Sequence, residues 1–478
     1  MSFKKIYQKN KLYLFSYLFL ILSSIFSVGF YHPDEHYQIL EFANYKLGNI
    51  NSSQLPWEFH EKIRPTLQPL LALITIKILN CISIDSPFTI SLILRLFSST
   101  LSLYTLNKLF YFFVKEFESE HLQKWFKLFS FFCWFLLFLG VRFSSENWST
   151  CIFIIGLLLF FSSEKKLKKD YFILGLFFGF SFLIRFQSAF LIMGFVLWMV
   201  FINKTRILTL IYLIISIFLI IIIGVLIDTW FYQSFTFTPY NYFYQNIILN
   251  KAENFGIEPW WYYFKSSFEK GIPPISIVFI IATIYFFVKH LKDPITWSFL
   301  PFILAHFYIG HKELRFLFPI LYFLPYFLIK SIENFTKNKS ISINQNRYIN
   351  ISIQFIFILN ITIYSIVIFR PMTTKIFLFE FVYNNYEEIT SIYYTDNNPF
   401  EEINFYKRKK LEIIKVDQKD IKKWLLNNNT NKLIITIPEK RNLFKDKKIL
   451  FQTYPLWLNN FNFRNWMKKS EQYLIYKL

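Results

Sequence analysis

Long apolar runs separated by short polar loops make up most of the chain. Residues 12–30, 207–227 and 272–288 are the clearest of these runs. A helix needs about 20 mainly apolar residues to cross the roughly 30 Å hydrocarbon core of a bilayer, so each run predicts a membrane-spanning helix. Lysines precede the first run and no small-x-small cleavage site follows it, which favours a first membrane helix over a signal peptide. The pattern predicts an all-α polytopic membrane protein with about 10 to 13 transmembrane helices.

Lysine and arginine gather in four of the loops between these runs. The four basic loops are residues 165–169, 203–206, 289–292 and 337–347. Because Lys and Arg resist translocation, such loops are expected on the cytoplasmic side. The opposite, lumenal or periplasmic side then receives residues 31–64, 142–148, 228–271, 310–315 and everything after about residue 370. The loops assigned to this second side also carry the unusual polar clusters.

One region does not follow simple alternation. Two apolar stretches, residues 67–84 and 88–114, lie between Arg64 and Lys115. If both crossed the membrane, Glu146 would lie on the cytoplasmic side. We therefore expect one of the two stretches to re-enter or to lie partly along the interface.

The chain after residue 370 lacks the long apolar runs of the preceding residues and has a different pattern. Short β-prone runs alternate there with polar pieces such as residues 418–426, which have a helical pattern. The β-prone runs are residues 391–394, 411–416, 432–437, 448–454 and 472–478. We expect a transmembrane domain over residues 1–370 and a small α/β extramembrane domain over residues 371–478.

Composition and charge limit the classes of partner that this protein is expected to bind. Apolar residues make up 54% of the 478 residues and charged residues only 17%, while the net charge is +21. The positive charge lies in short loops and in the last hundred or so residues, where anionic headgroups or lipid-linked phosphates are its expected partners. No nucleic-acid partner is expected. The three cysteines have neither metal-binding nor disulfide spacing.

The first polar cluster follows the first membrane helix. It comprises His32, Pro33, Asp34, Glu35, His36, Gln38 and Glu41. Pro33 suits the first turn of a new helix, on which Asp34 and Gln38 would share a face at i and i+4. A carboxylate placed here can take a proton from an acceptor hydroxyl. The alternatives are a polar interfacial turn, or a metal site made by the two histidines and an acid.

Two further charged sites interrupt apolar runs. Arg142 and Glu146 lie in one loop, where they either pair and cap helices or supply a second active-site acid. Arg185 lies deep within the run of residues 171–200. An arginine inside such a run must face protein or water, and a phosphate is a natural partner for it.

The last two clusters are an aromatic loop and a basic loop. Residues 228–271 begin at Asp228 and are rich in Trp and Tyr, which suits an interfacial belt, a sugar-binding surface or a polyprenyl-binding surface. The basic loop contains His311, Lys312, Glu313 and Arg315. Its cations would clamp a phosphate leaving group; the alternative is a solvated loop.

These clusters occur in the order of motifs found in one known family. Its HPDE-x-(W/F/Y)-Q-x-x-E signature is matched by HPDEHYQILE at residues 32–41, and its HKE-x-RF-(L/I)-x-P by HKELRFLFP at residues 311–319. Looser matches are Arg64 before a proline and residues 142–150. An aromatic segment of the family is matched at Asp228, Tyr232, Asn246, Trp260 and Tyr263. In these motifs, which span roughly residues 25–330, the sequence resembles glycosyltransferase family 22, the GT-C mannosyltransferases of N-glycan and GPI-anchor assembly that use dolichyl-phosphate mannose.

The resemblance implies a bundle of membrane helices and an inverting transfer of mannose from a polyprenyl-phosphate donor to a glycan or glycolipid acceptor. It implies that Asp34, or next Glu35, is the general base, with Glu146 as a further catalytic candidate. On chemical grounds the donor phosphate goes to Arg64, Arg185, Lys312 and Arg315. No metal or cofactor is expected, since a lipid phosphate is already a good leaving group. The remaining substrate-binding candidates are His32, His36, Gln38, Glu41, Arg142, Asp228, Tyr232, Asn246, Trp260, Tyr263, His311 and Glu313.

Two other functions stay open. A transporter or flippase for a lipid-linked sugar would also explain intramembrane charge and aromatic lining, but it predicts paired halves with interrupted helices. The sequence has no such internal symmetry. A GT-C transferase of another sugar is the second alternative. The compartment is the endoplasmic reticulum membrane or a bacterial inner membrane, according to the organism.

Overall fold

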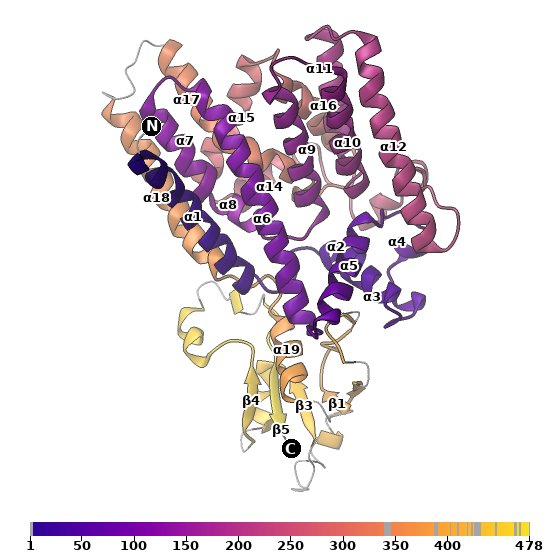
Figure 1. The fold of residues 1–478 in the computed structure, drawn as a ribbon. Helices are drawn as coiled ribbons and strands as arrows, with labels where there is room; N and C mark the ends of the chain where they lie inside the picture. The colour runs from indigo at the N-terminus through magenta and orange to yellow at the C-terminus, as the bar shows by residue number, and fades with distance from the viewer. Residues whose placement is uncertain are drawn as a thin grey trace. The chain divides into compact units, whose positions relative to one another are not determined.

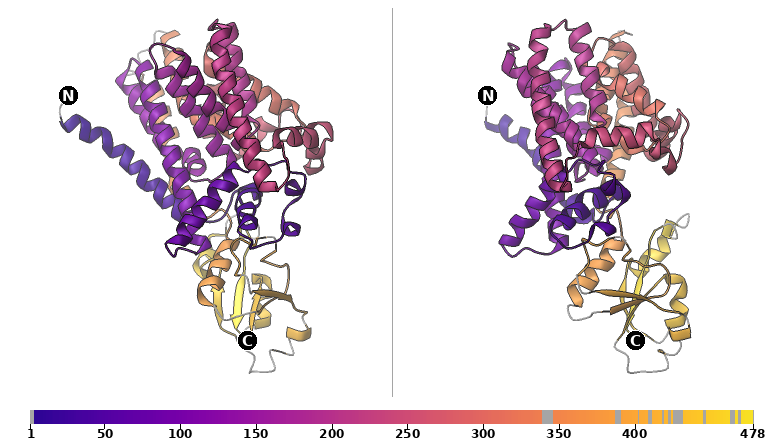
Figure 2. Two further views of the ribbon diagram at one scale, coloured as in Figure 1. Left: turned by 45° about the vertical axis from the view of Figure 1, so that its right-hand side comes forward. Right: turned by 90° about the vertical axis from the view of Figure 1, so that its right-hand side faces the viewer.

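The computed structural model divides into two compact units, which are described separately. It describes residues 3–338, 346–386, 391–401, 403–408, 411–417, 419–421, 424, 432–444, 447–462, 466–467 and 470–477. The first unit comprises residues 1–25, 57–70 and 94–370, and the second comprises residues 26–56, 71–93 and 371–478. Figure 1 gives the element labels and Figure 2 shows two further views.

The first unit is a bundle of helices. Its elements are α1 (Phe3–Phe26), α4 (Trp57–His60), α6 (Pro87–Phe113) from Leu94 onward, α7 (Glu120–Phe132), α8 (Trp134–Gly140), α9 (Ser145–Ser162), α10 (Lys168–Ile184), α11 (Ser188–Phe201), α12 (Ile207–Tyr232), α13 (Thr238–Phe243), α14 (Tyr262–Lys270), α15 (Ile275–Lys289), α16 (Pro294–Tyr308), the 3-10 segment η6 (Leu314–Phe323), α17 (Leu324–Asn338) and α18 (Arg347–Ile368). Residues from most of these helices form one continuous apolar core.

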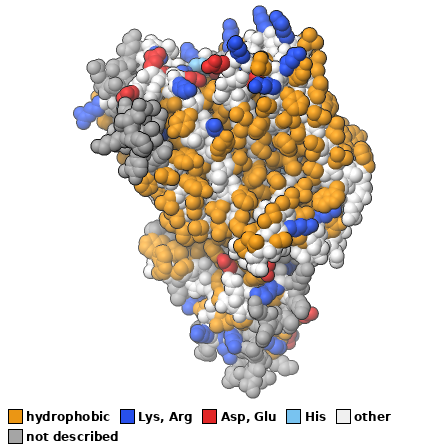
Figure 3. All heavy atoms as spheres, viewed as in Figure 1, with side chains coloured by type: hydrophobic (Ala, Val, Ile, Leu, Met, Phe, Trp, Pro, Cys, Tyr) orange, Lys and Arg blue, Asp and Glu red, His pale blue; other side chains and the backbone are white. Residues whose placement is uncertain are grey.

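Several helices are long and apolar enough to cross a membrane. Five meet this criterion within the described residues, and two bent pairs, α7 with α8 and α15 with α16, raise the number to as many as seven. Three shorter apolar helices of 10–17 residues accompany them. α12 has a mean hydropathy of 3.3 over its most apolar window, yet only 28% of that window is buried, so it presents its apolar side chains outward. Hydrophobic side chains cover the helical face seen in Figure 3. The expected number of spans, 10 to 13, stays a prediction.

The helices α9 to α12 run in alternating directions, so that their connections lie at two opposite ends of the bundle (Figure 1). One end holds the connections α9–α10 and α11–α12, which contain the first two basic loops. The other end holds the start of α9, the α10–α11 connection and the end of α12. Glu146, Arg185 and Asp228 lie at this second end.

The two stretches expected between Arg64 and Lys115 are helices of different length. α5 (Leu67–Cys81) has 15 residues and α6 has 27. At 1.5 Å per residue, α5 is about 22 Å long, shorter than the roughly 30 Å hydrocarbon core, whereas α6 is long enough to cross. Only α6 carries a window that meets the criterion for a span.

The second unit contains a five-stranded mixed sheet in the order β2-β1-β3-β5-β4. Its strands are β1 (Ser391–Tyr394), β2 (Glu412–Lys415), β3 (Leu433–Thr436), β4 (Ile449–Gln452) and β5 (Leu474–Lys477), each within one of the five β-prone runs. The predicted fold class, a helical membrane protein with a small C-terminal sheet, is confirmed. Part of the helix expected at residues 418–426 lies outside the described residues. The same unit contains α2 (Pro33–Glu35), α3 (Glu41–Lys46) and α19 (Lys375–Asn385).

Candidate functional site

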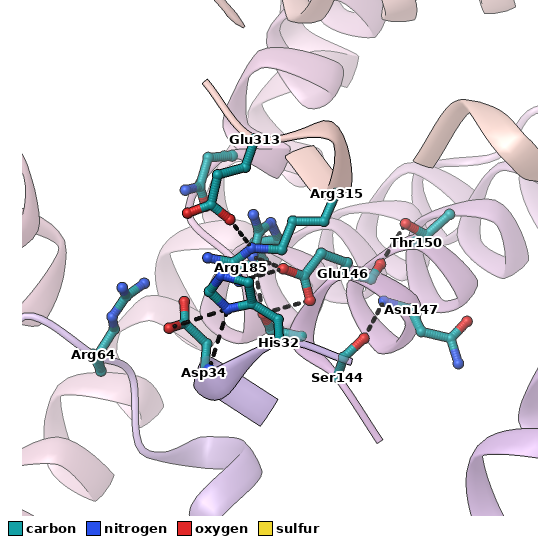
Figure 4. Close-up of polar contacts among 12 residues, drawn as sticks. His32, Asp34, Arg64, Ser144, Glu146, Asn147, Thr150, Arg185, Glu313 and Arg315 are labelled. Carbon is teal, nitrogen blue, oxygen red and sulfur yellow. Dashed lines mark hydrogen bonds and ion pairs between the residues drawn. The ribbon is translucent and has the colours of Figure 1, made fainter. Parts of the chain in front are cut away.

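Two arginines distant in sequence converge on one buried carboxylate in the helical unit. Oε1 of Glu146 lies 2.8 Å from Nη1 of Arg185 and 2.9 Å from Nη1 of Arg315. The three side chains are each less than a tenth exposed. Figure 4 shows Glu146 with the two guanidinium groups beside it. Two guanidinium groups therefore meet at one carboxylate oxygen, and such a buried gathering of cations favours a further anion in the same place.

The basic loop continues this arrangement. Nε of Arg315 donates to Oε2 of Glu313, whose Oε1 lies 3.0 Å from Nε2 of His311. The ring of Phe316 lies 5.4 Å from the guanidinium carbon of Arg185 and 5.3 Å from that of Arg315. Cation–π contacts of this kind stabilise a guanidinium group in place of water.

The start of α9 is fixed by a buried polar network. Ser144 caps the helix by accepting from the backbone N–H of Asn147, as Figure 4 shows. The Asn147 amide donates to the carbonyl oxygen of Arg142 at 3.0 Å and accepts from the Tyr322 hydroxyl at 2.7 Å. The same hydroxyl contacts Ser102 at 2.9 Å. These bonds fix the helical turn from which Glu146 projects.

Asp228 and Tyr232 hold the segment that carries Arg64. Oδ1 of Asp228 accepts from the backbone N–H and the hydroxyl of Thr66, at 2.9 and 2.6 Å, and Oδ2 accepts from Thr238. The Tyr232 hydroxyl donates to the carbonyl oxygen of Arg64 at 2.9 Å. Asp228, a predicted substrate-binding residue, therefore has both carboxylate oxygens occupied by the protein. Asp228 therefore links α12 to residues 64–66 through hydrogen bonds.

Two buried donor atoms in this region have no hydrogen-bond partner within the described residues, Nη2 of Arg185 and the hydroxyl of Tyr263. Nδ1 of His306 donates to the carbonyl oxygen of Phe302 at 2.7 Å, which leaves its buried Nε2 as an acceptor. Arg185 interacts electrostatically with both other residues. Burial raises the pKa of the Tyr263 phenol, so it remains a protonated donor. Buried donors without partners are rare in proteins and indicate a ligand or water. Sequence reasoning missed His306, although a histidine within an apolar run was a visible signal.

The first polar cluster lies in the other unit. His32 caps the short helix α2, because its Nδ1 accepts from the backbone N–H of Asp34 at 3.2 Å, and Pro33 occupies the first turn as predicted. The Asp34 side chain is 19% exposed. Oε2 of Glu35 accepts from the backbone N–H of Tyr31 at 3.3 Å.

The expectation of one continuous α-helix over this cluster was wrong. Residues His36–Leu40 form a π-helix, in which the N–H of Glu41 bonds to the carbonyl of His36. The spacing of i and i+4 thus no longer places Asp34 and Gln38 on one face. Instead the i, i+5 geometry brings His36 beside Glu41, with Nε2 and Oε1 2.9 Å apart and both side chains buried.

Glu41 is bound by its own unit. Oε1 also accepts from the backbone N–H groups of Asn404 and Phe405, at 2.5 and 2.8 Å, and Oε2 accepts from Asn44 at 3.1 Å. Burial acts to raise the pKa of Glu41, but the bonds from His36, Phe405 and Asn44 outweigh it and leave the pKa below its usual value. Glu41 is therefore an ionised structural anchor, and its ionisation requires His36 Nε2 to carry the proton.

The remaining predicted residues take other positions. Nζ of Lys312 is buried and donates to the carbonyl oxygens of Glu258, Ile309 and Gly310, which occupy all three of its protons. Asn246 donates to the carbonyl oxygen of Tyr242 one helical turn away, and Trp260 is 65% exposed. Within the residues described, no group of three or more His, Cys, Asp and Glu side chains is placed to hold a metal ion.

Comparison with known proteins gives one family and one fold. The Alg9-like mannosyltransferase family model matches residues 11–409. The chain is 26% identical over 336 residues to GPI mannosyltransferase 3 of Candida albicans, covering 68% of this chain and 64% of that one. It is 27% identical over 329 residues to the human GPI alpha-1,2-mannosyltransferase 3, covering 66% and 56%. The chain thus spans less than two thirds of the length of either relative.

Among solved structures, ArnT from Cupriavidus metallidurans, bound to undecaprenyl phosphate, matches with a TM-score of 0.52 and 8% identity. The match covers 98% of this chain and 97% of that one. At this identity the likeness shows a shared GT-C fold.

Proposed function

Because this chain belongs to the Alg9-like mannosyltransferase family, we propose that it transfers mannose from a polyprenyl-phosphate carrier to a hydroxyl of a glycan or glycolipid acceptor, with inversion at the anomeric carbon. The relatives named as GPI mannosyltransferases favour a GPI-like glycolipid as the acceptor. The reaction takes place on the lumenal or periplasmic face, at the end of the bundle opposite the first two basic loops.

One observation carries the proposal: Glu146 lies between Arg185 and Arg315, and Nη2 of Arg185 is buried without a partner in the described residues. Two buried guanidinium groups that meet at one carboxylate oxygen suit a phosphate group, which guanidinium binds through paired hydrogen bonds. In this proposal the two arginines hold the donor phosphate and Glu146 orients them. Tyr263 supplies a further protonated donor close to Arg185.

The chemical step follows from these roles. The Asp34 carboxylate takes the proton of the acceptor hydroxyl as its oxygen forms a bond to the anomeric carbon. The bond between that carbon and the phosphate oxygen breaks on the opposite face. The electron pair leaves with polyprenyl phosphate, whose negative charge the two guanidinium groups stabilise. Glu35 is the alternative base on the same turn.

Mannosyl transfer by the purified protein tests the proposal. Wild type, Asp34→Asn and Glu35→Gln are compared with a polyprenyl-phosphate-mannose donor and a GPI-like acceptor. Asp34→Asn is expected to lose at least about 100-fold in rate, as removal of a general base does, with unchanged thermal unfolding and donor binding. If Glu35→Gln alone loses this activity, the base is Glu35. A wild-type protein that binds the donor but transfers mannose to none of the acceptors would overturn the proposal and favour transport.

A further inference from the structure

The loop that carries Asp34 is attached to two short segments far along the chain, all within the second unit. The carbonyl oxygen of Val28 accepts from the backbone N–H groups of Met372 and Thr373, at 2.9 and 3.1 Å. The Thr373 hydroxyl donates to the carbonyl oxygen of Phe30 at 2.7 Å. Gly29 has φ +84°, and a Cβ there would lie 2.6 Å from Cβ of Thr373, so this approach requires glycine. Residues 28–30 are thus fixed immediately before the turn that carries Asp34.

The second attachment is made by Asn404 and Phe405, whose backbone N–H groups both bind Oε1 of Glu41. Glu41 in turn binds His36 at 2.9 Å. His36 follows Glu35 directly, so residues 32–35 lie between the attachment at residues 28–30 and the attachment at His36. A four-residue turn fixed on both sides has little freedom to change its backbone conformation.

Stacked rings reinforce the second attachment. The rings of Phe30 and His36 lie 5.1 Å apart and 23° from parallel, those of His36 and Tyr406 5.6 Å and 12°, and those of Tyr406 and Phe88 5.2 Å and 29°. The four rings form a column, with His36 between Phe30 and Tyr406. Offset stacks of this kind stabilise a structure by about 0.5–1.5 kcal/mol per pair beyond the buried area.

We propose that residues 404–406 position the general base: through Glu41 and His36 they fix the turn that carries Asp34. This inference rests on the proposed function, in which Asp34 is the base, and extends it by making a C-terminal segment part of the machinery. The positioning residues are Glu41 and Tyr406. Neither touches the reacting atoms in this proposal; they act through His36.

The experiment compares Tyr406→Leu and Glu41→Gln with a matched control, Phe444→Leu. Phe444 is as buried as Tyr406 and stacks on Tyr476, with ring centroids 4.7 Å apart, in the core of the C-terminal sheet. All variants are reconstituted in lipid nanodiscs as full chains. Hydrogen exchange is followed at the backbone amides of residues 31–41, and kcat and the donor KM are measured for mannosyl transfer.

Tyr406→Leu and Glu41→Gln are expected to speed amide exchange in residues 31–41 and to lower kcat at least about 10-fold, with the donor KM changed less than about 2-fold, since misplacement of a reacting group acts on the chemical step. Tyr406→Phe keeps the ring and should restore both readouts. Phe444→Leu should lower thermal stability while leaving exchange at residues 31–41 and kcat near wild type.

Two outcomes would overturn the positioning role. One is unchanged exchange and kcat in Tyr406→Leu and Glu41→Gln; the other is an equal fall of kcat in Phe444→Leu at matched loss of stability, which indicates general destabilisation. Failure of the proposed function is distinguishable, because exchange is measured without substrate. If wild type transfers no mannose while Tyr406→Leu speeds exchange in residues 31–41, the result supports the anchoring of the turn. The same result contradicts the proposed mannosyl transfer.

Discussion

Oε1 of Glu146 lies 2.8 Å from Nη1 of Arg185, although 39 residues separate them in the sequence and both side chains are almost fully buried. The same oxygen lies 2.9 Å from Nη1 of Arg315. The sequence allowed Glu146 two roles, as an acid that pairs or as a catalytic group. Its place between two guanidinium groups favours the pairing role, in which it holds the two cations that we propose to bind the donor phosphate.

Replacement of Glu146 by Gln should therefore act first on stability. The substitution removes the carboxylate that pairs with Arg185 and leaves Arg315 with Glu313, and breaking a buried ion pair costs about 3–5 kcal/mol. Thermal and denaturant unfolding in detergent micelles measure the change. Glu120→Gln, at an exposed position at the start of α7, is the control and should unfold like wild type. Full stability of Glu146→Gln together with abolished transfer would instead identify Glu146 as a catalytic carboxylate.

Arg185→Lys should weaken donor binding while the fold is retained. Lysine keeps the positive charge but loses the planar fork that binds two phosphate oxygens and stacks on Phe316. The Kd for polyprenyl phosphate, measured by calorimetry or by protection against thermal unfolding, is expected to rise at least about 10-fold, which corresponds to 1.4 kcal/mol. Arg206→Lys, at an exposed position in a basic loop, should leave the Kd unchanged. An unchanged Kd in Arg185→Lys would remove Arg185 from the phosphate site.

Asp228→Ala tests whether Asp228 binds substrate or ties the protein together. Its two oxygens accept three hydrogen bonds from Thr66 and Thr238. Hydrogen bonds to a charged group contribute about 1.5–3 kcal/mol each and are not additive, so a loss of about 2–5 kcal/mol is expected. Asp228→Asn retains one oxygen for Thr66 and should fall between Ala and wild type. If both variants unfold like wild type but lose donor affinity, Asp228 contacts substrate directly.

The two ring nitrogens of His311 both face acceptors, Gly256 O at 3.1 Å and Glu313 Oε1 at 3.0 Å, and only the imidazolium form donates to both. The hydrogen bond to Glu313 raises the pKa of His311 above its usual value, against the opposing effect of burial. A pKa raised by folding means that the stabilisation is complete below the unfolded-state pKa of about 6.5 and is lost as pH rises through the folded-state value.

The free energy of unfolding, measured from pH 5.5 to 8.5, should consequently fall with pH more steeply in wild type than in His311→Gln. His60→Gln, at an exposed position, is the control and should follow the wild-type curve. Parallel curves for wild type and His311→Gln would show that His311 does not gain a proton on folding.

The fold was largely predictable because its signals are local. Apolar runs identify membrane helices wherever they occur, and the five β-prone runs each contain one strand. Arg185 was also predictable, because a charge inside an apolar run has few explanations. By contrast, the convergence of Arg185 and Arg315 on Glu146 depends on the packing of α9, α10 and η6. No local pattern encodes that packing.

The site residues that the sequence did not identify also differ in whether they had a local signal. His306 had a local signal, as a histidine within an apolar run. Phe316 lies in the motif matched at residues 311–319, which gave it no role of its own. Tyr322 had no local signal, since an aromatic residue in a chain with 63 Phe and 30 Tyr is unremarkable until its neighbours are known. The π-helix at His36–Leu40 changed the faces assigned from α-helical spacing, because the bond between His36 and Glu41 and the backbone of residues 404–405 stabilise an i, i+5 geometry.

Tyr322→Phe removes one oxygen from the network that supports α9. The hydroxyl contacts Asn147, Ser102 and Cys151 at 2.7, 2.9 and 3.1 Å, and the side chain is 1% exposed. Its loss leaves buried polar groups with fewer partners, which costs about 1–3 kcal/mol.

Because Asn147 adjoins Glu146, the turn that carries the carboxylate should also become less ordered, so the donor KM should rise along with the loss of stability. Tyr308→Phe provides a matched control: Tyr308 is 92% exposed at the end of α16, and removal of its hydroxyl should change neither quantity. Equal unfolding temperatures and equal donor KM for Tyr322→Phe and Tyr308→Phe would show that the network does not support the ion pair. A loss of stability with an unchanged KM would confine Tyr322 to the packing of the bundle, apart from the arginine pair.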